Sequence, residues 1–146
     1  WKSFKNIYSN QKSLNLNDLN DIINLEDIDF INLQYGEVKN EVNEYNNSSK
    51  NQIIDLKNID LFNDFLKVSS ILKNLDLFIT VSNSTAHLAG ALGVKTILIK
   101  PFNQATFHYW NQPTTKTPWY SNVELLERTE LNKSINFRDK ILSILN

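Results

Sequence analysis

The sequence predicts an α/β fold of the Rossmann-like, doubly wound type with a mostly parallel sheet. Three short apolar runs, at residues 30–33, 77–81 and 96–99, are rich in β-branched and aromatic residues and do not alternate with polar ones. Such runs are typical of strands buried on both faces. Segments with helical spacing lie between them, and strands that alternate with helices favour parallel pairing.

The helices and remaining strands follow from local signals. Asn17 and Asp18 are candidate N-caps of a first helix. Apolar residues recur at threes and fours over 61–75, and good helix formers fill 85–92. Ala86, Ala89, Gly90 and Ala91 keep the helix at 85–92 slim enough to sit close to the sheet, and Gly93 suits the left-handed residue that ends this helix. Weaker strands are expected at 52–56 and 123–127, and a closing helix at 136–145.

Residues 101–121 differ from the rest of the chain. They hold all three prolines and two of the three tryptophans, and they show no regular period. A long loop in a small domain is usually functional or disordered, and the aromatic content argues against disorder. We therefore expect one ordered loop here.

Composition narrows the function classes. With 146 residues the chain has the size of a single domain, 1–146, and its net charge of -1 gives no reason to expect nucleic acid as a partner. Cysteine is absent and there are two histidines, so a structural metal is not expected. No apolar stretch is long enough to span a bilayer, and we expect a soluble, cytoplasmic protein. Because the chain opens on Trp1, we also expect a fragment whose first strand has been trimmed near that residue.

The most informative segment is 81–93, which runs from the end of a strand through a polar turn into a helix. In open α/β sheets, ligands bind at the carboxyl ends of the strands. Ser82, Asn83, Ser84 and Thr85 bring polar side chains next to the free N–H groups of a helix N-terminus, where a phosphate can bind. His87 follows in the first turn. Taken alone, the cluster fits a helix cap at least as well as a phosphate site, and His87 fits a structural histidine.

The combined pattern resembles a known family. The string AHLAGALG after a strand, followed by a second strand, a proline and W…PWY, is similar to the C-terminal domain of bacterial heptosyltransferase-like glycosyltransferases of the GT-B fold, which are often attached to tetratricopeptide repeats. The resemblance covers nearly the whole chain. Its other segments are residues 1–3, 12–14, 31–36, 74–77, 107–110 and 118–120.

This resemblance implies a nucleotide diphosphate sugar as donor, bound between two Rossmann-like domains with its pyrophosphate at the helix that carries His87. Ser84, Thr85 and His87 then become donor-site candidates. No cofactor or metal is implied. An N-terminal domain of the same protein would bind the acceptor and usually supply the catalytic base, so the catalytic residues are unknown. The chain departs from the family at Ser82, where many relatives have aspartate, and at Asn83, where they have threonine.

Further candidates each have a structural alternative. Lys12 could balance the charge of the leaving diphosphate, or be an ordinary solvated lysine. Gln34 and Gly36 end the second strand of the family pattern, where a glycine permits approach of a nucleotide but also suits a tight turn. Trp110, Trp119 and Tyr120 could stack on base or sugar, or pack the loop onto its own domain.

Three other interpretations stand beside the donor-binding one. Asp27 and Asp29 form an Asp-X-Asp pair, but they precede a strand, at the wrong end of the sheet, so we expect them to be solvated and to hold no metal. The rival function is a non-catalytic, degenerate Rossmann-like module for nucleotide binding or assembly, favoured by Ser82 in place of the usual acid. A sugar-nucleotide epimerase would share the GT-B plan, but this chain lacks the acidic groups that such an enzyme is expected to have at the N-terminus of the helix. The donor base, the sugar and the acceptor cannot be identified from the sequence.

Overall fold

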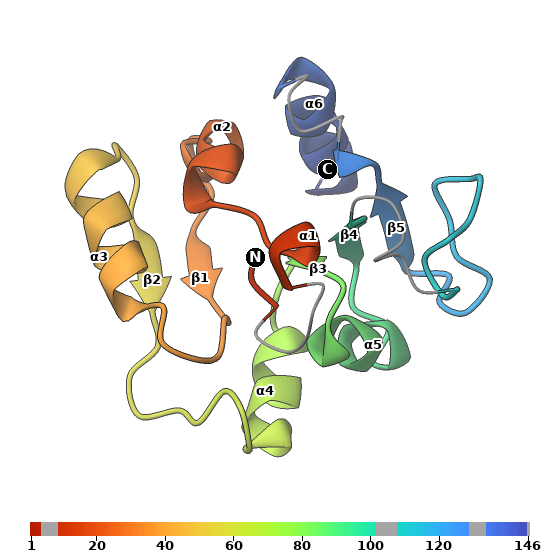
Figure 1. Ribbon diagram of the computed structural model, residues 1–146, viewed down its shortest axis with the longest axis horizontal. Helices are drawn as coiled ribbons and strands as arrows, with labels where there is room; N and C mark the ends of the chain where they lie inside the picture. Colours follow the sequence, from red (N-terminus) through yellow and green to blue (C-terminus); the bar gives the residue numbers. More distant parts are fainter. Residues whose placement is uncertain (4–8, 102–107, 129–133, 146) are drawn as a thin grey trace.

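The structure is a computed structural model that describes residues 1–3, 9–101, 108–128 and 134–145 (Figure 1). Five short strands and a series of helices alternate along the chain. Their order is α1 (Ser9–Lys12), η1 (Leu16–Leu19), α2 (Asn20–Ile23), β1 (Phe30–Asn32), α3 (Lys39–Ser48), β2 (Ile53–Asp55), α4 (Phe65–Leu72), β3 (Phe78–Val81), α5 (Ser84–Ala91), β4 (Thr96–Ile99), β5 (Val123–Leu126) and α6 (Ser134–Leu145).

All strand pairs between these elements are parallel, which confirms the α/β class with parallel pairing. Strand β1 pairs with β2, Phe30 lying opposite Ile53. Strand β4 lies between β3 and β5, and Ile97 is opposite both Ile79 and Glu124. The described strands form two sheets, β1–β2 and β3–β4–β5, instead of the single sheet expected. Figure 1 shows the two sheets on either side of the chain's N-terminus.

The core follows from the strands that the sequence marks most clearly. All four residues of β4 are buried, as expected for a strand covered on both faces. Helix α5 packs on this sheet through Ala86 and Ala89, which are fully buried. Small side chains at these positions let the helix lie close to the strands. Ala91 was expected to serve the same purpose but is exposed.

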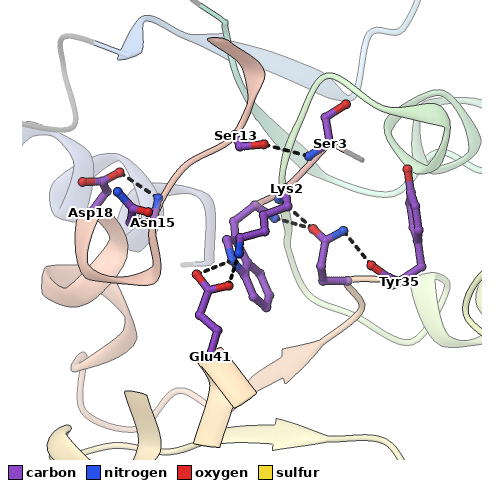
Figure 2. Close-up of polar contacts among 9 residues, drawn as sticks. Lys2, Ser3, Ser13, Asn15, Asp18, Tyr35 and Glu41 are labelled. Carbon is purple, nitrogen blue, oxygen red and sulfur yellow. Dashed lines mark hydrogen bonds and ion pairs between the residues drawn. The ribbon is translucent and has the colours of Figure 1, made fainter. Parts of the chain in front are cut away.

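Three helical segments differ from the sequence expectations. Helices α1 and α3 were not anticipated, and α3 gives little signal because Val42 and Tyr45 are its only buried residues and the rest of its sequence is polar. The helix expected after Asn17 and Asp18 begins earlier, as the 3-10 helix η1. It follows Asn15, whose backbone N–H donates to the Asp18 carboxylate at 2.9 Å (Figure 2). A 3-10 turn precedes α2 here, so Asn17 and Asp18 lie inside the helical segment instead of before it.

The other expected elements are present with modest changes of length. Helix α4 begins at Phe65, after Asp64, whose side chain accepts a hydrogen bond from the Lys67 N–H. In the loop between β4 and β5, the described part contains a single antiparallel bridge, Lys116 with Glu124. Within the described ranges, no helix has the length and apolar character needed to cross a membrane.

Gly93 offers a test of the fold at the end of α5. Its φ is +75°, and a Cβ added there would meet no atom within 4 Å. We expect Gly93→Ala to lower the free energy of unfolding by about 1–2 kcal/mol, through the left-handed backbone alone. Gly93→Asn should cost less, since asparagine tolerates this conformation. Urea unfolding measures both, and an alanine variant as stable as the parent would contradict the assignment.

Candidate functional site

The turn from β3 into α5 is organised by Asn83. Its side-chain oxygen accepts a hydrogen bond from the Ala86 N–H at 2.9 Å, and its amide nitrogen donates to the Thr80 hydroxyl at 3.1 Å. The sequence allowed two roles for Asn83, a helix cap or a phosphate ligand, and in the structure it caps the helix. Its side chain fixes the direction in which α5 leaves the sheet.

The remaining residues of the turn differ in access. Ser82 is buried, with 4% of its surface exposed, so its side chain is not open to a ligand in this structure. Ser84 is exposed and Thr85 is half-buried. These two residues begin α5, where backbone N–H groups have no partner within the helix. Of the predicted cluster at 82–85, Ser84 and Thr85 are thus the residues that can contact a bound anion.

His87 lies on α5 within a cluster of aromatic rings. Its Nδ1 is 3.1 Å from the Tyr120 hydroxyl, and its ring centroid is 4.7 Å from that of Trp110 and 4.9 Å from that of Tyr109. Burial lowers the pKa of His87 from its ordinary value of 6.5. The imidazole is therefore held neutral more strongly than in water.

The aromatic residues of the loop have different roles. Trp110 is fully buried among Ala86, Leu98 and Val123, so it packs the loop down and exposes no face for stacking on a donor. Trp119 is 56% exposed. Tyr120 lies over Gly90, where an added Cβ would come within 2.6 Å of the Tyr120 ring. Gly90 therefore makes room for the Tyr120 ring, whereas the sequence analysis expected it to let the helix lie close to the sheet. Phe107, part of the matched loop, lies outside the described residues.

Helix geometry separates the candidates on α5. Residues two apart in an α-helix point about 200° apart around its axis, so Thr85 and His87 lie on different sides. Thr85 lines a cavity with Gln34 and Tyr35. His87 instead faces Tyr109, Trp110 and Tyr120. Both sides flank the same helix N-terminus.

A second hollow next to the N-terminus of α5 was not anticipated from the sequence. Tyr35 and Phe62 form a tilted ring pair with centroids 5.4 Å apart. Together with Ser84, Thr85 and other residues they line a cavity of about 300 Å³. Phe62 and Phe65 are more than half exposed. The unusual exposure of two phenylalanines is a signal that only the structure provides.

At the end of β1 the structure corrects the role expected of Gln34. Its side-chain oxygen accepts hydrogen bonds from the backbone nitrogens of Trp1 and Lys2, at 2.9 and 2.7 Å, and its amide nitrogen donates to the Tyr35 carbonyl at 3.1 Å. Gln34 is buried and bonds the chain to itself, so it is not available to a nucleotide here. Gly36 has a φ of +87°, which supports the tight-turn interpretation.

Three charged residues complete this edge of the molecule. Lys12 is buried, contrary to the solvated alternative, and burial lowers its pKa. Lys100 follows β4, is also buried, and forms an ion pair with Glu127, which follows β5. The Lys100 ammonium also donates to the Gln112 carbonyl at 3.2 Å. Sequence analysis did not single out Lys100, although a lysine that directly follows a buried strand lies at the binding edge of a parallel sheet.

Acidic side chains do not gather into a metal site in the part of the chain that the structure describes. Asp27 and Asp29 precede β1 and are exposed, at the amino end of the strand. This is the end of the strand at which the sequence interpretation placed them.

Comparison with known proteins finds a similar sequence over part of the chain. The chain is similar to the protein FlbA of Caulobacter vibrioides, with 32% identity over 95 residues. The matched region is 64% of this chain and 15% of FlbA, so the chain spans only a small part of that relative. No family model matches the chain, and no solved structure matches it.

The lowered pKa of His87 predicts a pH dependence of stability. Since the folded form binds this proton less tightly than the unfolded chain, the free energy of unfolding should fall as the pH drops from above 6.5 toward the lower pKa of the folded form. His87→Gln should remove that part of the pH dependence. Denaturant unfolding at several pH values measures it, and His108→Gln, at an exposed histidine, is the matched control. Equal pH profiles for parent and His87→Gln would contradict the assignment.

The contact between Gly90 and Tyr120 predicts a specific packing defect. Gly90→Ala should displace the Tyr120 ring and break its contact with His87, at a cost of about 1–3 kcal/mol in stability. Ala91→Ser, at the exposed neighbouring position, should change stability by less than about 0.5 kcal/mol. Near-ultraviolet circular dichroism and thermal unfolding report the two effects. A Gly90→Ala variant with an unchanged aromatic spectrum would show that Tyr120 does not depend on this glycine.

Proposed function

We propose that the chain is the donor-binding domain of a glycosyltransferase of the GT-B, heptosyltransferase-like kind, which takes its sugar from a nucleotide diphosphate sugar. The observation that carries the proposal is the N-terminus of α5, which lies at the carboxyl edge of a parallel sheet with Ser84 exposed and Thr85 lining a cavity. A helix N-terminus in this position favours a diphosphate.

In the proposed reaction the acceptor displaces the nucleoside diphosphate at the anomeric carbon of the sugar. Negative charge grows on the departing diphosphate as that bond breaks. The free N–H groups at the start of α5 and the Thr85 hydroxyl would donate hydrogen bonds to it, which stabilises the transition state more than the ground state. The base that takes the acceptor's proton would come from another domain.

His87 would add a further donor to the diphosphate. When the Tyr120 hydroxyl donates to Nδ1, the neutral imidazole carries its proton on Nε2, which is then a hydrogen-bond donor. An arriving diphosphate also favours the imidazolium form. Affinity should then rise as the pH falls through the pKa of the bound state toward the lower pKa of the free state.

The hollow next to α5 suits the nucleoside part of such a donor. It combines the rings of Tyr35 and Phe62 with the apolar Leu88, and it reaches Ser84 and Thr85. Apolar, aromatic walls beside a few polar groups are typical of small-molecule sites. Trp119, with its ring half exposed, remains a candidate for stacking on the sugar.

A non-catalytic nucleotide-binding or assembly module is the second candidate. It is favoured by Ser82, which places a buried hydroxyl where the resembled family has a carboxylate. Such a module would keep the fold and the helix N-terminus but not the transfer reaction.

Nucleotide titration tests the proposal. We expect UDP, ADP or GDP to bind, and His87→Ala to weaken the tightest of them by about ten- to a hundredfold, the loss of a charged hydrogen bond. Thr85→Val should weaken binding by about two- to tenfold, because it removes a neutral one. Isothermal titration calorimetry between pH 5.5 and 8 measures affinity and proton uptake together.

His108→Ala and Thr115→Val, at exposed positions of the loop, are the matched controls and should bind like the parent. Thermal unfolding confirms that each variant is folded. If no nucleoside diphosphate binds, the proposal fails for both the enzyme and the module. If one binds and the full-length protein transfers no sugar from the corresponding nucleotide sugars, the non-catalytic module is the correct function.

A further inference from the structure

We propose that Tyr120 is a positioning residue of the candidate site. In this proposal its hydroxyl group donates a hydrogen bond to Nδ1 of His87 and thereby keeps the proton of the neutral imidazole on Nε2. The inference deepens the proposed function and rests on it, because the diphosphate of a donor is the group that would receive the hydrogen bond from Nε2.

The side chain of Tyr120 lies along one face of α5. A Cβ added to Gly90 would be 2.6 Å from Cγ of the Tyr120 ring and 2.7 and 2.9 Å from its two Cδ atoms. At the other end of the ring, the hydroxyl oxygen is 3.1 Å from Nδ1 of His87. His87 and Gly90 are three residues apart and therefore share a face of the helix. The phenol thus runs from Gly90 toward the N-terminus of α5, with its hydroxyl group at the imidazole.

The fold holds Tyr120 in this position from two sides. The backbone carbonyl of Tyr120 accepts a hydrogen bond from the Val123 N–H at 3.2 Å, and Val123 is fully buried at the start of β5. Gly90 lies beneath the ring and has no side chain that would displace it. A tyrosine that is fixed at its backbone and at its ring loses little further freedom when its hydroxyl group forms a hydrogen bond.

The other rings around His87 hold the imidazole through packing. Trp110 is fully buried, and its ring centroid is 4.7 Å from that of the imidazole at an angle of 33°. Tyr109 meets the imidazole edge-on at 4.9 Å. The Trp110 indole N–H has no hydrogen-bond partner among the described residues. Within this part of the chain, the Tyr120 hydroxyl group is the one hydrogen-bond partner of the His87 ring.

The donor and acceptor capacities of the two groups determine the direction of this hydrogen bond. A neutral imidazole has one N–H group and one acceptor nitrogen, while a tyrosine hydroxyl group can donate or accept. If an Nδ1–H group of His87 donated, the hydroxyl proton of half-buried Tyr120 would have no acceptor among the residues that the structure describes. If the hydroxyl group donates, both groups at this contact are satisfied. The proton of the imidazole then lies on Nε2.

The direction of the bond matters because the imidazole is held neutral. Burial lowers the pKa of His87 from 6.5, and no charged side chain of the described residues contributes to this shift. The titratable side chains that contact the ring are Tyr109 and Tyr120. With its proton on Nε2 the neutral ring offers an N–H group to an anion, whereas the other tautomer would offer a lone pair and repel it. In the imidazolium form both nitrogens carry protons, so Tyr120 has no tautomer to select.

Nitrogen-15 NMR of the histidine rings tests the proposal. In the parent at pH 8 we expect the proton of His87 on Nε2, with a preference over Nδ1 of about tenfold or more. Tyr120→Phe keeps the ring over Gly90 but removes the hydroxyl group, and should reduce this preference by about two- to tenfold. Tyr109→Phe is the matched control. It removes a hydroxyl group from a ring that only packs against the imidazole, and should leave the preference unchanged.

The positions of the proton decide the proposal. A loss of preference in Tyr120→Phe but not in Tyr109→Phe supports it. A parent protein with the His87 proton on Nδ1 overturns it, because the hydroxyl group would then be the acceptor. An unchanged preference in Tyr120→Phe, or an equal loss in Tyr109→Phe, also overturns it. Gly90→Ala displaces the Tyr120 ring and should lower the preference in the same way, so it replaces Tyr120→Phe if that variant does not fold.

Nucleotide binding separates this inference from the proposed function. The ligand is whichever of UDP, ADP and GDP the parent binds most tightly. At pH 8 Tyr120→Phe should weaken its binding by about two- to fivefold, and the difference should shrink at pH 5.5, where more of the bound imidazole is protonated.

The two proposals fail in different ways. If the parent binds none of the three nucleotides, the proposed function fails, and the NMR result alone decides whether Tyr120 sets the tautomer. If one of them binds and His87→Ala weakens binding at pH 8 while Tyr120→Phe does not, the positioning role is overturned and the proposed function stands.

Discussion

The site depends on how closely α5 lies against the β3–β4–β5 sheet. Ala86 and Ala89 have no exposed surface, and they belong to two different core clusters. One cluster joins α5 to α4 through Val68 and Leu72, and the other joins it to β4 and the aromatic loop. Larger side chains at either alanine would move the helix away from the strands. The N-terminus of α5 would then no longer meet the carboxyl edge of the sheet.

Sequence alone predicted best those elements whose pattern reflects burial. The run at 96–99 became a fully buried strand, and Gly93 has the left-handed backbone expected of a helix end. Helix α3 could not be found this way, because a ten-residue helix that buries two side chains has almost no apolar period. The break between the two sheets was also beyond sequence analysis, since each strand's pattern records its faces and not its edge partners.

The candidate site shows where residue types are ambiguous. Asparagine and glutamine at strand ends can bind a ligand or bond the chain to itself, and the hydrogen-bond partners decide which. Asn83 caps α5 and Gln34 holds Trp1 and Lys2, so both are occupied by the fold. Trp110 similarly supports the loop from within the core. What remains for a ligand is Ser84, Thr85, the Nε2 atom of His87 and the exposed Trp119, a smaller set than the motif suggested.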